Sequence, residues 1–167
     1  TGALYIRQDL LSAIRPTFIR YAQSDINGYL LPAPGARRYE MGESYSPSML
    51  GLETTLTWLR DDVGWEWLYA RVATLGRLCC ETLESIPLLS ITTPREKMAG
   101  LVCFTVEGFT PQELTAELFK RGITIRYVAY PPGPIVARVA VGWWNTEEEI
   151  ANLASALSEI IAAGPAA

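Results

Sequence analysis

The spacing of apolar residues changes once along this chain, near Pro87, and that change restricts the fold. Before Pro87, apolar residues recur at helical spacing in two adjoining stretches, 46–64 and 65–85. After it come four short β-branched runs bounded by Pro and Gly: 88–91, 100–106, 123–128 and 135–143. Two further helices are expected at 110–122 and after Asn145. The order α-α-β-β-α-β-β-α predicts an α+β fold, with helices layered on a small, mostly antiparallel sheet.

Local signals mark the ends of the later helices. Capping-box spacing occurs at Thr110 with Glu113 and at Thr146 with Glu149, and Gly122 is a typical helix stop. The helix at 65–85 carries a stripe of the width expected for a core-facing helix. That stripe comprises Trp65, Leu68, Tyr69, Val72, Leu75, Cys79 and Leu83.

The first 45 residues have weaker patterns. Residues 1–7 have strand-like composition, 9–14 can form a short helix, and 24–38 is rich in Gly, Pro and Asn, as in a long loop. We expect 1–7 to be a strand whose hydrogen-bond partners lie outside this chain. Ser46 and Pro47 then form an N-cap and first-turn pair for the helix at 46–64.

Composition excludes several classes of protein. A net charge of −4 with scattered Lys and Arg gives no field for nucleic acid, so no nucleic-acid binding is expected. No apolar run reaches the roughly 18 to 20 residues that span a bilayer, so we expect no membrane insertion and a cytoplasmic location. Three cysteines without CxxC spacing predict reduced thiols in the core: Cys79, Cys80 and Cys103. The absence of histidine removes the commonest general base and argues against an autonomous hydrolase.

Five segments in a fixed order carry a resemblance to a known family. They are TGALYIR at 1–7, RPTFI at 15–19, RRYEMGES at 37–44, ITIR at 123–126 and ARVAVGWWNTEEEI at 137–150. Together they resemble the C-terminal part of class V aminotransferases and cysteine desulfurases, which are pyridoxal-phosphate (PLP) enzymes of fold type I. The resemblance implies a remnant of the large PLP-binding domain at 1–45, a C-terminal α+β domain at 46–167, and a homodimeric parent that binds PLP and an amino-acid substrate.

The resemblance also implies that the Schiff-base lysine would lie just before the segment matching 1–7. The sequence contains two lysines, Lys97 in a polar turn and Lys120 in the last turn of a helix, where a cation suits the helix dipole. Neither is placed as an imine partner. We therefore expect no catalytic residue in this chain, no bound PLP, and no activity of this chain alone.

Two sites are implied by matching positions. Residues 39–44 correspond to a loop that reaches the cofactor phosphate of the neighbouring subunit, which makes Gly42 and Ser44 candidate cofactor contacts. Glu43 stands where the family often has threonine, and a carboxylate repels phosphate, although Ser44 beside it can substitute. An ordinary loop is the alternative for this segment.

Arg138 is the candidate anchor for the substrate carboxylate. Strand alternation places it on the face opposite Ala137 and Val139, as the one charge in an apolar run. A guanidinium matches a carboxylate in bidentate fashion, and the family match assigns this role to an arginine here. Arg126 on a neighbouring strand is the weaker candidate, and a structural ion pair is the alternative.

The type of reaction is narrowed by the loop between Arg126 and Arg138. Cysteine desulfurases carry a persulfide-forming cysteine on this loop, and the sequence YVAYPPGPIVA has none. The resemblance is therefore nearest to C–S lyases acting on cysteine or cystine, with epimerase-like proteins and transaminases left open. A non-catalytic α+β regulatory or interaction module is the alternative from another class.

Overall fold

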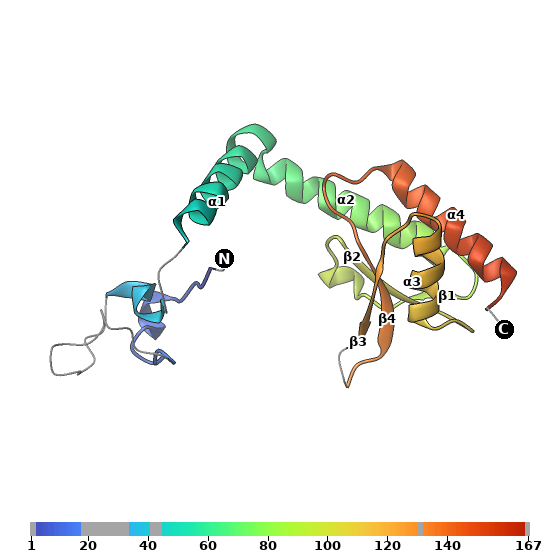
Figure 1. Cartoon of the computed structure of the whole chain (residues 1–167), viewed down its shortest axis with the longest axis horizontal. Helices are drawn as coiled ribbons and strands as arrows, with labels where there is room; N and C mark the ends of the chain where they lie inside the picture. Colours follow the sequence, from blue (N-terminus) through green and yellow to red (C-terminus); the bar gives the residue numbers. More distant parts are fainter. Residues whose placement is uncertain (1–2, 18–33, 41–44, 130–131, 166–167) are drawn as a thin grey trace. The chain divides into compact units, whose positions relative to one another are not determined.

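The chain forms two compact units, Thr1–Asp61 and Asp62–Ala167, in a computed structural model that describes residues 3–17, 34–40, 45–129 and 132–165 (Figure 1). Each unit is described by itself. The expected end of a large-domain remnant at residue 45 stays a prediction.

The first unit opens with short 3-10 turns. Residues 3–7 are not in a strand, because no described residue forms a ladder with them. The helix expected at 9–14 is only a single 3-10 turn, η1 (Gln8–Leu10). A second 3-10 helix, η3 (Gly35–Tyr39), forms at the end of the expected loop. The two are joined by the Tyr39 hydroxyl, which donates to the carbonyls of Leu11 at 3.1 Å and Ile14 at 2.9 Å.

Helix α1 (Ser46–Trp58) begins one residue earlier than expected. Tyr45, and not Ser46, is the N-cap, and it makes no side-chain capping bond, so the predicted Ser46 cap is wrong. Pro47 in the first turn is confirmed. A π-helical turn, η4 (Leu59–Val63), follows. The apolar side chains of α1 are exposed: Met49, Leu50, Leu52, Leu56 and Trp58.

Helix α2 (Trp65–Glu84) follows Gly64, whose φ of +84° suits glycine. Its predicted stripe is buried in the second half, where Leu75, Cys79 and Leu83 are fully inaccessible. In the first half it is not, and Tyr69 is 65% exposed. Gly76 allows close packing, because a Cβ there would overlap the carbonyl oxygen of Ala99.

The sheet of the second unit has four antiparallel strands in the order β1-β2-β4-β3. Their bounds are β1 Leu89–Ile91, β2 Leu101–Val106, β3 Arg126–Ala129 and β4 Ile135–Ala140, with a 3-10 turn η5 at Arg95–Lys97. The α+β class and the antiparallel pairing are confirmed. All four strands are shorter than expected. The largest differences are in β3, where residues 123–125 do not pair with β4, and in β4, which ends before a corner at Gly142.

Helices α3 (Pro111–Lys120) and α4 (Glu147–Ala163) start at the two predicted capping boxes, and both boxes are formed in full. Together with α2 they cover one face of the sheet (Figure 1). The core lies between these helices and alternate strand residues: Val102, Phe104 and Val106 of β2, and Ala137 and Val139 of β4. No helix in the described part of the chain is long and apolar enough to cross a membrane.

Candidate functional site

The second face of the sheet is not covered by α2, α3 or α4, and we call it the open face. It consists of the strand residues that alternate with the core residues: Leu101, Cys103 and Thr105 of β2, Val136, Arg138 and Ala140 of β4, and Arg126 and Val128 of β3. Leu101 and Arg126 are exposed, whereas Cys103 and Arg138 are half-buried. The predicted orientation of Arg138, away from Ala137 and Val139, is therefore confirmed.

Two arginines lie directly opposite each other on this face. Arg126 of β3 pairs with Arg138 of β4, and like charges at paired positions repel. Among the described residues, no carboxylate forms an ion pair or hydrogen bond with either side chain. The predicted alternative for Arg138, a structural ion pair, is therefore not formed within the described part.

The Nε atom of Arg138 is buried and has no hydrogen-bond partner among the residues that the structure describes. A buried donor without an acceptor costs roughly 1–3 kcal/mol, and more when the group is charged. The arrangement thus combines an unsatisfied donor with uncompensated positive charge. An anion bound at Arg138 would satisfy both, and a carboxylate suits the planar guanidinium because it accepts two parallel hydrogen bonds.

Cys103 of β2 is paired with Arg138 on the other side of β4 from Arg126. Arg126, Arg138 and Cys103 thus form a row across the open face. The expectation that all three cysteines lie in the core is correct for Cys79 and Cys80 and wrong for Cys103. The alternation of β2 contained the signal: Val102 and Phe104 face the core, so the residue between them faces the other way.

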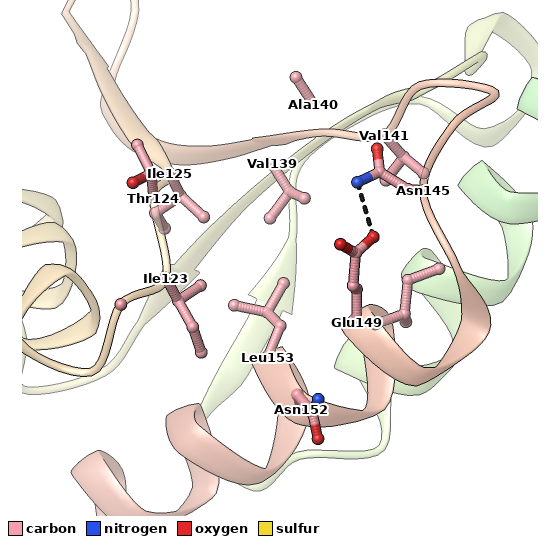
Figure 2. Close-up of a pocket in the computed structure, with 12 residues that line it drawn as sticks. Ile123, Thr124, Ile125, Val139, Ala140, Val141, Asn145, Glu149, Asn152 and Leu153 are labelled. Carbon is pink, nitrogen blue, oxygen red and sulfur yellow. Dashed lines mark hydrogen bonds between the residues drawn. The ribbon is translucent and has the colours of Figure 1, made fainter.

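A hydrogen-bonded corner fixes the chain where β4 ends. The Asn145 side chain accepts from the backbone N–H of Gly142 at 2.7 Å. It also donates to Glu149 at 2.9 Å, the bond drawn as a dashed line in Figure 2. Arg71 of α2 donates to both carboxylate oxygens of Glu147 at 2.5 and 3.0 Å. The hydrogen bond from Arg71 is the largest cause lowering the pKa of Glu147 to about 2. The corner therefore holds the end of β4 against α2 and α4.

A cavity of about 350 Å³ lies beside this corner (Figure 2). Residues 122–125 line one side, while Leu153, Asn152 and Glu149 of α4 line another. It occupies the gap left because 123–125 do not continue the pairing of β3 with β4. Its lining is mixed: aliphatic side chains such as Ile123, Val139 and Leu153 lie beside Glu149, which is engaged in capping α4.

The described residues do not offer an anchor for PLP. Lys97 is exposed in η5, and Lys120 of α3 forms an ion pair with Glu117 at 2.5 Å. Neither lysine belongs to the open face. The predicted phosphate contacts Gly42 and Ser44, with Glu43 between them, lie outside the described residues and stay predictions. The described residues therefore fit a carboxylate ligand but not the imine of the cofactor.

Known proteins with similar sequences include cysteine desulfurases. The chain is 28% identical over 172 aligned residues to the cysteine desulfurase of Synechococcus elongatus, covering 95% of this chain and 27% of that protein. It is 24% identical to the cysteine desulfurase of Cronobacter sakazakii, covering 95% of this chain and 41% of that protein. The chain thus spans less than half the length of these relatives.

Solved structures agree in fold. The cystine C–S lyase C-DES, in complex with its product cysteine persulfide, superposes with a TM-score of 0.79 and 25% identity, covering 96% of this chain and 42% of that one. An apo cysteine desulfurase from Thermococcus onnurineus superposes with a TM-score of 0.80 at 22% identity, over 95% and 42% of the two chains. The sequence model of class-V aminotransferases matches residues 1–153. This chain therefore belongs to the aminotransferase class-V family.

Proposed function

We propose that this chain provides the substrate-carboxylate site of a PLP-dependent enzyme that acts on a small amino acid, nearest in type to the C–S lyases. The observation that carries the proposal is the pairing of Arg126 with Arg138 on the open face, with no carboxylate partner among the described residues. In this proposal the Schiff-base lysine is contributed by residues outside this chain, which is inactive alone. The parent enzyme is a cytoplasmic homodimer.

The comparisons support an amino-acid ligand. One similar structure is a C-DES mutant with glycine covalently linked to its PLP cofactor, matched at 25% identity and a TM-score of 0.78 over 93% of this chain and 41% of that one. Another contains cysteine persulfide as the reaction product. Both bound molecules carry an α-carboxylate, which is the group that the open face is suited to bind.

Each arginine has a separate task. Arg138 is half-buried in the middle of the sheet and binds the carboxylate, which fixes the ligand along one direction. Arg126 lies on the edge strand β3 and is exposed, so it adds positive charge without being held rigidly. Because β4 is paired on both sides, its backbone cannot shift easily, and the carboxylate is held at a defined place.

The flanking residues suit this role. Ala140, the next open-face residue along β4, is small and leaves room for a ligand. Leu101, opposite Ala140 on β2, is 49% exposed and offers apolar surface beside the charged row. A ligand covering Leu101 would exclude water from the arginine–carboxylate contact and thereby strengthen it.

The test is substitution of Arg138 in the full-length protein with its cofactor. Losing a charged bidentate contact costs on the order of 2–4 kcal/mol, or roughly 30-fold to 1000-fold in kcat/KM. We expect Arg138→Ala to fall in that range for amino-acid turnover, and Arg138→Lys to recover part of the loss. PLP occupancy, followed by visible absorbance, should stay unchanged.

Arg126→Ala is the matched control, because it removes the paired charge on the exposed edge strand. We expect Arg126→Ala to lower kcat/KM for amino-acid turnover less than Arg138→Ala does. If turnover by Arg138→Ala stays within about threefold of wild type while Arg126→Ala abolishes it, the anchor lies on β3 and not on β4.

A further inference from the structure

Cys103 and Arg138 are directly opposite on β2 and β4, and their backbone hydrogen bonds show which kind of antiparallel pair they form. The Cys103 backbone N–H donates to Thr93 Oγ1 at 2.7 Å, and its carbonyl accepts from the Thr92 N–H at 2.8 Å. Both backbone groups therefore point toward β1 and away from β4. Cys103 and Arg138 thus form a non-hydrogen-bonded pair, the kind whose Cβ atoms approach to about 4.5–5.5 Å.

Cys103 differs from the other two thiols in its surroundings. Cys79 is fully inaccessible in the core, and burial raises its pKa to about 12, which leaves almost no reactive thiolate at neutral pH. Cys80 is also fully inaccessible. Cys103 is half-buried on the open face and is paired with Arg138, whose buried Nε has no hydrogen-bond partner among the described residues.

We propose that Cys103 is a substrate-contacting residue of the carboxylate site, and that it selects an amino acid bearing a disulfide on its β-carbon. Cystine is the simplest such molecule. The inference rests on the proposed binding of the carboxylate by Arg138. With the carboxylate on Arg138, the sulfur atoms of the ligand lie two bonds or more from the α-carbon and come within reach of the opposite thiol.

The chemistry that follows is thiol–disulfide exchange, in which the ligand itself is the oxidant. The Cys103 thiolate attacks one sulfur of the ligand, a protein–ligand S–S bond forms, and the ligand S–S bond breaks. The other half of the ligand leaves as a thiolate and takes up the proton that Cys103 released. No further oxidant or cofactor is needed.

Carboxylate binding should make this exchange selective. A neutral disulfide such as 2-hydroxyethyl disulfide has the same reactive bond but nothing for Arg138 to hold. A charge-assisted contact worth about 1.4 kcal/mol corresponds to a tenfold preference. We therefore expect Cys103 to react about tenfold faster with cystine than with the neutral disulfide, after normalising both rates to those of free glutathione.

The experiment uses the purified, reduced 167-residue chain without PLP. The rate of mixed-disulfide formation is measured by intact mass spectrometry, and the modified cysteine is identified by peptide mapping. Variants are Cys103→Ser, Arg138→Met, which keeps a long unbranched side chain, and Arg138→Lys, which keeps the charge. Circular dichroism checks that each variant is folded.

The expected result is labelling of Cys103 with the cystine preference, loss of that label in Cys103→Ser, and loss of the preference in Arg138→Met with partial recovery in Arg138→Lys. Equal normalised rates for the two disulfides, an unchanged preference in Arg138→Met, or labelling confined to Cys79 and Cys80 would overturn the inference. If Cys103 is labelled selectively but substitution of Arg138 does not change enzyme turnover, the proposed function alone is contradicted. If substitution of Arg138 lowers turnover but Cys103 is not labelled selectively, the role of Cys103 alone is contradicted.

Discussion

The two faces of the four-stranded sheet are built from the same strands but differ in what their side chains need. On the covered face, residues such as Phe104 and Val102 are fully buried against α2, α3 and α4. On the open face, Arg138 lies opposite Arg126, and its buried Nε has no hydrogen-bond partner in the described part of the chain. The first face is packed against helices, whereas the second carries two paired positive charges that no carboxylate among the described residues neutralises.

This difference suggests a separate role for each face of the sheet: the covered face stabilises the fold, and in our proposal the open face binds a ligand. Neighbouring residues of a strand point to opposite faces of the sheet. One strand can therefore contribute both to the core and to a ligand site. A favourable contact is expected for every buried group that serves only the fold. The buried donor of Arg138, which has no partner among the described residues, is the reason for our proposal that Arg138 binds a ligand.

The sharpest contrast between the faces is the adjacent pair Phe104 and Cys103 of β2. Phe104→Ala removes a fully buried ring and should lower the free energy of unfolding by roughly 3–5 kcal/mol. Cys103→Ala removes one half-buried sulfur on the open face and should cost less than about 1 kcal/mol. Urea denaturation measures both. Equal losses would mean that the open face is packed as tightly as the core.

The helix layer can be tested at the start of α4. Thr146 Oγ1 accepts from the Glu149 N–H at 3.2 Å, and Glu149 accepts in return from the Thr146 N–H at 3.0 Å. Thr146→Ala should therefore lower the free energy of unfolding by about 1 kcal/mol. Ser158→Ala, within α4 and away from the cap, is the control and should change it by less than about 0.5 kcal/mol. Similar values for both would show that the capping box adds nothing.

The open face should respond to substitution with the opposite sign. Arg138→Met removes a like-charge pair and an unsatisfied donor while keeping a flexible, unbranched apolar side chain, so the free energy of unfolding should rise by about 0.5–1 kcal/mol. Arg126→Met removes the like-charge repulsion alone and should give a smaller rise. Thermal and urea unfolding of the chain provide the measurement. A loss of stability in Arg138→Met would mean that this arginine serves the fold.

The smallest expected effect is the pH dependence of the corner behind β4. Because Arg71 depresses the pKa of Glu147 from 4.5 to about 2, the folded state releases this proton more readily than the unfolded chain. The stabilisation is therefore present above about pH 4.5 and is lost as pH falls toward 2. Glu147 is 57% exposed, so solvent screens the contact and the effect is small. The Tm difference between wild type and Glu147→Gln should shrink over that interval, and a constant difference would contradict the assignment.

The features that could be predicted from sequence are those determined by neighbouring residues. The capping boxes at Thr110 and Thr146 formed as expected, because their partners are three residues away. The second half of the α2 stripe and the orientation of Arg138 followed from simple periodicity. The predicted cap at Ser46 failed because the chain enters the helix one residue earlier, at Tyr45.

Features that depend on tertiary partners were not predictable in the same way. Residues 123–125 have strand composition but diverge from β4, and a cavity lies where pairing was expected. The register that sets Arg126 and Cys103 on either side of Arg138 requires the strand order β1-β2-β4-β3, which periodicity does not contain. Sequence therefore indicated the arginines singly, whereas the structure supplied the row that they form with Cys103.

The most direct test of the central claim, that Arg138 binds a carboxylate on the open face, is competitive inhibition of the full-length enzyme by propionate compared with propionamide. The two molecules have nearly the same shape, and only the first carries the charge that Arg138 would bind. The account predicts that Arg138→Ala weakens inhibition by propionate at least about tenfold and leaves that by propionamide unchanged. An unchanged inhibition constant for propionate in Arg138→Ala would contradict it.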